Sequence, residues 1–311
     1  ALGVDRVYPN ASAKERNEKL NKLLADPKAE PPKGLAGLER FLKVTGDDKA
    51  SRELYAEMMG IHHAALEASA KDPKAGTEFL RVFCEEAYNR WRGGIGAGRV
   101  SYDSIFAQRH EVTVFFFLAS DPQINTANAT SRASIMFNSP KLTTHLSGPE
   151  STSGMRKLFM EWIANERQPY MQQRGFQIAG QIGMKEALPL ALKIIDQKGL
   201  AATNRAQALL SLTKLGNKDN LKDIEGLLSD KSVITTVNFG NGMTTVQMRD
   251  VALATSIVLS GQNMSDFGFD NRFGGIGNNL SSYIYCGFAD DKPRDAAHAK
   301  WQEWLGKNPK K

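Results

Sequence analysis

The sequence predicts an all-α fold, a right-handed α-solenoid of helix pairs with one inserted β-hairpin and an irregular C-terminal cap. Similar helical runs begin at Arg174, Arg205 and Arg249, so one helix-pair unit recurs along the chain. The interval between the last two arginines contains a segment, 232–247, in which the apolar period changes to two. Helix-pair units bury their apolar faces by stacking on one another, and this stacking produces an extended surface.

The composition is that of an ordinary globular protein. Of 311 residues, 41% are hydrophobic and 24% are charged, which is sufficient for a substantial core. The net charge of +6 is a small excess spread along the chain, and this favours a solvated surface over a dedicated nucleic-acid patch. The longest apolar run, 114–119, is far shorter than the roughly 18 residues of a membrane helix, so no membrane span is expected.

Cys84 and Cys286 are too few and too far apart for a disulfide framework. Buried free thiols are the default interpretation, and one long-range disulfide is the alternative in an oxidising compartment. The sequence begins at Ala1, so a cytoplasmic location and export after removal of a signal peptide both stay open. The oligomeric state does not follow from the sequence.

The first 34 residues, 1–34, are predicted to form an N-terminal arm and a Pro-rich linker, because they are charged and end near Pro31 and Pro32. A helical domain is expected over 35–150. Its most distinctive part is VTVFFFLA from Val112, which is apolar nearly all round and predicts a helix at the centre of the domain.

Three further features of the helical domain follow from capping and loop length. Asp47 or Asp48 is expected to cap a helix that ends at Gly60, and a further helix follows it. The Asn-, Ser- and Thr-rich stretch 121–154 is too long for a structureless loop, so a helix is expected near 131–147.

Repeated helix pairs are predicted over 151–265, with the β-hairpin inserted at about 232–247. Gly183 and Gly216 fall at the turns between paired helices, where a left-handed C-terminal cap favours a residue without a Cβ atom. After the repeats, 266–311 is rich in aromatic residues and glycine and closes with a helix, which is typical of a capping segment.

The stretch 205–230, RAQALLSLTKLGNKDNLKDIEGLLSD, resembles a HEAT-like repeat of the phycobilisome-lyase type. In that repeat an Arg-opened helix ends in Leu-Gly and a second helix ends in Leu-Leu-x-Asp. Residues 174–196 match less fully, and 249–261 match the first helix alone, so about a third of the chain is covered. The resemblance implies architecture and not chemistry, because such repeats serve scaffolds, lyases and DNA glycosylases.

Three other segments, GDDKASRELYAEM, TVQMRDVALATSIVLSGQ and GFADDKPRDAAHAKWQEWL, are similar to parts of large helical-repeat proteins from planctomycete bacteria. That family has no assigned activity, so this resemblance adds no functional expectation.

A structural ladder of aspartates and arginines is expected between the repeats. Asp196 ends one unit before Arg205 opens the next, and Asp230 ends that unit before Arg249 opens the third. Charge-assisted hydrogen bonds between them would fix the stacking register, each contributing on the order of 1.5 to 3 kcal/mol where buried.

No catalytic, cofactor-binding or metal-binding residues are predicted. The GGIGAGRVS stretch from Gly93 departs from the phosphate-loop pattern, because Arg99 replaces its Lys and Val100 its Ser or Thr. The histidine pairs lack metal-ligand spacing, and adjacent carboxylates on a helix diverge by about 100°, too far to flank one bond.

Aromatic and basic side chains are the predicted partner-binding residues. Those expected in the hairpin, the cap and the loop region after Arg90 are Phe239, Asn241, Phe267, Phe269, Phe273, Trp91, Arg92 and Arg99. The sequence therefore favours a non-enzymatic interaction or scaffold module that holds a protein partner. The alternative is a nucleic-acid-binding repeat protein or a repeat-type DNA glycosylase, which would need a concave groove lined by arginines with an Asp and a Trp at its centre. A third hypothesis, a lyase-type enzyme, rests on the repeat resemblance alone.

Overall fold

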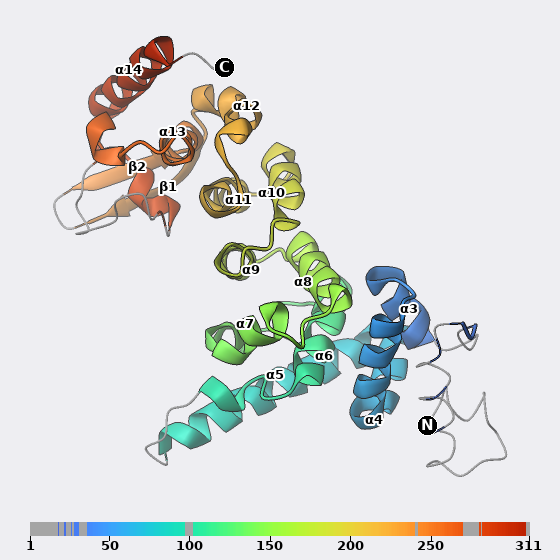
Figure 1. The fold of residues 1–311 in the computed structure, drawn as a ribbon. Helices are drawn as coiled ribbons and strands as arrows, with labels where there is room; N and C mark the ends of the chain where they lie inside the picture. Colours follow the sequence, from blue (N-terminus) through green and yellow to red (C-terminus); the bar gives the residue numbers. More distant parts are fainter. Residues whose placement is uncertain are drawn as a thin grey trace. The chain divides into compact units, whose positions relative to one another are not determined.

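The computed structural model describes residues 18, 22, 26, 28–30, 36–96, 102–239, 242–269, 280 and 282–308. The described chain is mostly helical with a two-stranded antiparallel hairpin, as predicted (Figure 1). It divides into two compact units, Ala1–Gln168 (unit 1) and Pro169–Lys311 (unit 2). The predicted N-terminal arm lies almost entirely outside the described residues. None of the described helices is both long enough and apolar enough to span a membrane.

Unit 1 is built around one buried helix. Its elements are α3 (Ala36–Thr45), α4 (Lys49–Lys71), α5 (Pro73–Gly96), η1 (Tyr102–Ser104), α6 (Arg109–Ala119), η2 (Ala133–Asn138), α7 (Pro140–Ser147) and α8 (Ser153–Asn165). Helix α6 contacts α4, α5, α7 and α8. Phe115, Phe116 and Phe117 are at most 1% exposed, which confirms the prediction that VTVFFFLA forms the central helix.

The division between the units comes later than the sequence indicates, after Gln168 and not after 150. Helix α8 causes this difference. Its apolar stripe packs on α3, α4 and α6, so Phe159 and Trp162 belong to the core of unit 1. Periodicity alone does not reveal which neighbour an amphipathic helix covers.

Helix α4 continues through Gly60, where the sequence predicts its end. Asp48 caps it as predicted, because its side chain accepts a hydrogen bond from Ser51 N at 2.7 Å. The backbone departs from helical dihedrals at His62 (φ −122°, ψ 15°) and then resumes the helix. Beyond the kink, Glu67 is buried and accepts a hydrogen bond from the Tyr55 hydroxyl at 2.8 Å. Such tertiary contacts outweigh the roughly 1 kcal/mol cost of a helical glycine.

Unit 2 contains a row of helices. Its elements are α9 (Pro169–Gln181), α10 (Ala187–Asp196), α11 (Ala202–Leu215), η3 (Lys218–Asn220), α12 (Leu221–Ile224), η4 (Glu225–Ser229), β1 (Val233–Asn238), β2 (Met243–Gln247), α13 (Met248–Leu259), η5 (Met264–Phe267), η6 (Tyr283–Cys286) and α14 (Asp291–Lys307). Helix α11 packs between α9 and α13, and Figure 1 shows these three nearly end-on. Helix α10 packs on α11, while η4 and α14 pack on α13.

Helices α9 and α11 run in the same direction and approach closely. Near their first halves, Asn204 Nδ2 donates to Gln172 Oε1 at 2.8 Å, and both side chains are buried. Near their last turns, a Cβ atom added to Gly180 would lie 2.7 Å from Lys214 Cβ. Gly180 therefore allows the two helices to come together at this end.

The two turn glycines serve different purposes. Gly183 has φ +65°, which confirms the predicted left-handed turn after α9. Gly216 has φ −92°, so a left-handed conformation is the wrong prediction there. A Cβ atom at Gly216 would instead lie 2.9 Å from Asn220 Oδ1 and 3.0 Å from Leu212 O. Glycine is favoured at this turn because a side chain would be crowded, and not because the backbone is left-handed.

Both cysteines are free and buried. Burial raises the pKa of both thiols, to about 12 for Cys84. They therefore stay protonated at neutral pH and pack as small apolar side chains.

Candidate functional site

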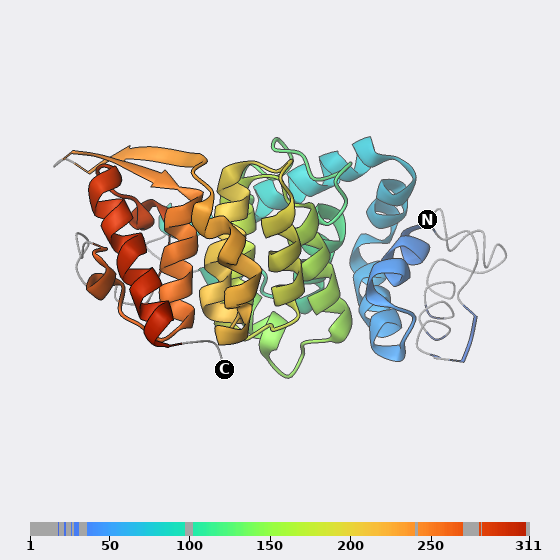
Figure 2. The ribbon, with the colours of Figure 1, turned by 90° about the horizontal axis from the view of Figure 1, so that it is seen from above.

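The hairpin of unit 2 has one buried and one exposed face. Strands β1 and β2 pair antiparallel, with Thr236 opposite Thr245, close to the predicted bounds of 232–247. Thr244 and Val246 are buried, whereas Met243, on the other face, is 56% exposed. Figure 2 shows the hairpin lying across one end of α13 and α14.

Strand β2 has partners along both edges. Thr245 N donates to Phe288 O at 3.0 Å, and Phe288 N donates to Thr245 O at 3.2 Å. Both backbone groups of Thr245 therefore point away from β1. Residues directly opposite each other in an antiparallel pair share one pair type, so Thr236 and Thr245 form a non-hydrogen-bonded pair. Their hydroxyl oxygens lie 3.5 Å apart, consistent with the short separation typical of such pairs.

It follows that the N–H and C=O of Thr236 point outward, along the free edge of β1. No hydrogen bond joins these two groups to another residue in the described part of the chain. The strand carries no Lys, Asp, Glu or Pro, the residues that commonly protect sheet edges. A register irregularity between Val233 and Thr235 limits the regular part to 235–238.

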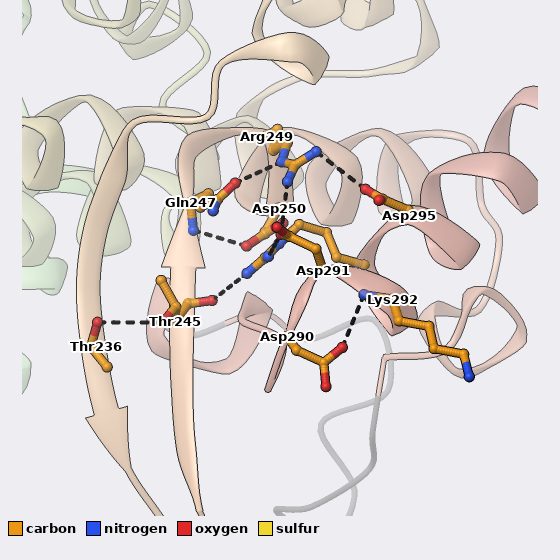
Figure 3. Close-up of polar contacts among 10 residues, drawn as sticks. Thr236, Thr245, Gln247, Arg249, Asp250, Asp290, Asp291, Lys292 and Asp295 are labelled. Carbon is orange, nitrogen blue, oxygen red and sulfur yellow. Dashed lines mark hydrogen bonds and ion pairs between the residues drawn. The ribbon is translucent and has the colours of Figure 1, made fainter.

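A charged network holds the inner side of the hairpin (Figure 3). Asp250, in the first turn of α13, accepts from Gln247 N at 2.8 Å and from Arg294 Nε at 2.8 Å. Arg294 also donates to Thr245 O at 2.9 Å and pairs with Asp291. One guanidinium group therefore joins β2, α13 and α14.

Burial raises the pKa of Asp250 to about 6, although the Gln247 N–H and the Arg294 guanidinium group oppose this shift. The Asp250 and Arg294 side chains are 0% and 2% exposed. Such a pair fixes the relative positions of its elements, and its chemistry does not offer an accessible acid or base for catalysis.

The predicted ladder arginines have partners other than those expected. Arg205 Nε donates to Ile195 O at 2.8 Å, and its Nη1 lies 3.8 Å from Asp230 and not beside Asp196. A cation at the C-terminal end of α10 is favoured by the helix dipole, which explains this orientation. Arg249 pairs with Asp291 and Asp295 of α14, and only its backbone N–H reaches Asp230, at 2.8 Å to the carbonyl oxygen.

The expected aromatic partner-binding surface of the cap is wrong for two residues. Phe267 and Phe269 are each 5% exposed. Their rings pack against Trp301 and Phe288, with centroid distances of 5.8 and 4.9 Å. Both side chains are core residues, because Trp301 of α14 covers Phe267, and Phe288, just before α14, covers Phe269. Phe239, near the hairpin turn, is half-buried, and Phe273 and Asn241 lie outside the described residues.

The basic and aromatic residues of unit 1 are only partly available. Trp91 is half-buried and stacks on Tyr102 at 6.0 Å, as expected for a residue on the apolar stripe of α5. Arg92 is exposed, and Arg99 lies outside the described residues. Within the described ranges, no three His, Cys, Asp or Glu side chains gather where a metal ion could bind.

A groove of about 630 Å³ lies between α9 and α11 in unit 2. Among the described residues that line it, Arg174 and Lys214 carry charge and none is acidic. The lining residues are Gln173, Arg174, Phe176, Gln177, Gln181, Gln207, Leu210, Ser211, Lys214 and Leu280. Sequence reasoning missed this groove, although Gln173, Gln177 and Gln181 recur at a spacing of four, which places them on one side of a helix.

A smaller cavity of about 210 Å³ lies between the α12–η4 segment, α13 and α14. Its wall includes His298 and Trp301, whose Nε2 and Nε1 atoms are buried without a hydrogen-bond partner. Burial lowers the pKa of His298, and the nearby Arg249 acts in the same direction. This cavity suits a small hydrogen-bonding molecule such as water.

Comparisons with family models, with curated proteins and with solved structures give no match to this chain.

Proposed function

We propose that this chain is a non-enzymatic protein-interaction or scaffold module that binds a partner through the free edge of β1. The outward N–H and C=O of Thr236 carry this proposal, because an extended segment of another protein can pair with them by adding a strand. Val233 and Met243, the exposed apolar side chains of the hairpin, are 57% and 56% exposed and would contact such a segment.

The bracing of the hairpin also supports this role. An interaction surface gains affinity when it is held in the binding-competent conformation before the partner arrives. The Arg294 guanidinium group contacts Thr245 O, and Asp250 contacts Gln247 N, so β2 is fixed at two points. Strand β1 is thereby presented on a rigid base with one edge exposed.

The architecture that we propose for unit 2 is a right-handed solenoid of HEAT-like helix pairs. The row of α9, α11 and α13 supports it, since a repeat of two helices places the first helix of each pair beside the first helix of the next. The hairpin would then be an insertion between the second and third pairs, and insertions of this kind often form the binding face.

A nucleic-acid-binding protein of the DNA glycosylase type is less well supported. That function would need a groove in which arginines surround an Asp and a Trp. Of the described residues that line the α9–α11 groove, Arg174 is the sole arginine, and none is Asp or Trp.

Two substitutions of one residue test the proposed function. Thr236→Pro removes the outward N–H, whereas Thr236→Val keeps it and preserves β propensity. Affinity capture with the native chain and the Val variant should retain the same proteins, and the Pro variant should lose them. For a partner purified in this way, the Thr236 amide should exchange more slowly in the complex. Equal capture by all three baits would contradict the proposal.

A further inference from the structure

Two polar groups in the wall of the smaller cavity, between the α12–η4 segment, α13 and α14, lack partners. Trp301 is 1% exposed and His298 is half-buried, and both line this cavity. Neither Trp301 Nε1 nor His298 Nε2 has a hydrogen-bond partner in the described part of the chain. The two residues are three apart on α14, so they lie on the same side of the helix. Buried polar groups without partners lower stability, and a molecule in the cavity can supply the missing partner.

Aromatic neighbours hold the Trp301 indole in place. Trp304 stacks on it, with ring centroids 5.0 Å apart and 12° between the ring planes. Phe267 packs against it in an edge arrangement at 5.8 Å. Rotation of the indole toward a different hydrogen-bond partner would break both contacts. The indole N–H is therefore a fixed donor whose partner must come to it.

The two nitrogen atoms together match a hydroxyl group. Burial lowers the pKa of His298, and Arg249 acts in the same direction, so the imidazole is neutral at neutral pH and Nε2 can accept a hydrogen bond. The Trp301 N–H only donates. A hydroxyl group accepts from one and donates to the other, whereas a carboxylate has no proton to donate and an ammonium group cannot accept. Glu225, the one described lining residue with a full charge, is negative and further disfavours an anion.

The remaining wall favours a carbon framework with more than one hydroxyl. The cavity volume of about 210 Å³ is several times the roughly 30 Å³ of one water molecule. Leu221, Leu228 and Leu305 line part of it, and water beside them is readily displaced by carbon atoms. The Ser256 hydroxyl, also in the wall, donates to Ala252 O at 2.8 Å, so its free lone pair can accept from a second ligand hydroxyl.

We propose that this cavity binds a small neutral polyol or monosaccharide, one hydroxyl of which accepts a hydrogen bond from Trp301 Nε1 and donates one to His298 Nε2. The ligand site goes beyond the proposed binding of a partner strand and does not rest on it. The cavity and the β1 edge can each be altered without the other.

Nuclear magnetic resonance of the tryptophan indole N–H groups tests the proposal. The chain has four tryptophans, so the signals are few, and Trp301→Phe identifies the one that matters. The neutral probes are sorbitol and glucose, and the charged probes are gluconate and N-methylglucamine. At least one neutral probe should shift the Trp301 signal in a saturable way, with a Kd on the order of 1 mM, as is usual for a ligand this small. Both charged probes should bind at least fivefold more weakly.

Matched variants assign the shift to this cavity. His298→Leu removes Nε2 and should weaken the neutral probe roughly fivefold, the loss of one net hydrogen bond. Ser256→Ala removes the second acceptor and should weaken it severalfold. Ala299→Leu, at an adjacent exposed position outside the cavity lining, is the control and should leave binding unchanged. Thr236→Pro should also leave it unchanged, which separates this site from the proposed β1 site.

Three results would overturn the inference. The first is the absence of a saturable shift with either neutral probe, because the cavity would then hold water alone. The second is binding of gluconate or N-methylglucamine as tight as that of the neutral probes, because the site would then select charge and not hydroxyl groups. The third is unchanged affinity in His298→Leu. If that variant does not fold, unchanged affinity in Ser256→Ala overturns the inference in the same way.

Discussion

Arg294 and Asp250 form an ion pair in unit 2 that is almost completely removed from solvent. Arg294 Nε lies 2.8 Å from Asp250 Oδ1, and the side chains are 2% and 0% exposed. The same guanidinium group donates to Thr245 O. The ion pair therefore connects α14 and α13 with β2, the inner strand of the hairpin.

Removal of one partner should destabilise unit 2 strongly. Arg294→Met leaves the Asp250 carboxylate buried with the Gln247 N–H as its remaining partner, and we expect a loss of about 3 to 5 kcal/mol in the free energy of unfolding. Urea denaturation measures this loss. Lys307→Met, which breaks the exposed pair with Glu303, is the control and should have no measurable effect. Equal effects of the two variants would contradict a structural role for the buried pair.

The raised pKa of Asp250 predicts a pH dependence of stability. Because its folded-state pKa of about 6 exceeds the ordinary value of 3.8 for an aspartate, the folded state binds the proton more tightly. The resulting stability is fully present below pH about 4 and is lost as the pH rises through about 6, by an amount on the order of 3 kcal/mol. Denaturation at a series of pH values, for the native chain and Asp250→Asn, measures the difference. The stability of the native chain relative to Asp250→Asn should fall as the pH rises from about 4 to about 6. A relative stability that stays constant over this range would refute the raised pKa of Asp250.

The turn at Gly216 should not tolerate a side chain. Gly216→Ala places a Cβ atom against the Leu212 carbonyl oxygen and Asn220, and we expect a loss of about 1 to 3 kcal/mol. Gly226→Ala, in η4, is the control, because no atom lies within 4 Å of the added Cβ. Thermal unfolding of both variants compares them. If Gly216→Ala is as stable as the control, crowding does not select glycine at this turn.

Positions that tolerate proline should alternate along β1 with positions that do not. Thr236→Pro removes an outward N–H and should preserve the hairpin. Val237 is paired with Thr244 in the adjacent, hydrogen-bonded position, so Val237→Pro removes a hydrogen bond between the strands. Far-UV circular dichroism and thermal unfolding should show a lower melting temperature for Val237→Pro alone. Similar melting temperatures for the two proline variants would mean that the pair types are assigned incorrectly.

Local sequence signals predict the central helix of unit 1 and the hairpin well. VTVFFFLA is apolar on all sides, and such a helix can be stable only where neighbours surround it. Likewise, the β-branched residues on either side of the turn near Asn238 form the two predicted strands. In both cases the information lies within one segment.

Features that depend on distant segments could not be predicted. The aromatic residues around Phe267 predict an exposed surface from the sequence. In the structure, α14, which begins more than twenty residues later, covers Phe267. Arg294 is likewise far from Asp250 in the sequence, and its role needs both partners. Gln207 lies in the run 206–212 of α11, in which every residue is buried, so periodicity does not separate it from the core.

Site-resolved amide hydrogen exchange of the uncomplexed chain tests the central claim most directly, because it reports which N–H groups of β1 are hydrogen-bonded. We predict that the Thr236 amide exchanges at nearly the unprotected rate while the Val237 amide is strongly protected. Protection of Thr236 equal to that of Val237 would contradict a free outer edge, and with it the proposed binding of a partner strand.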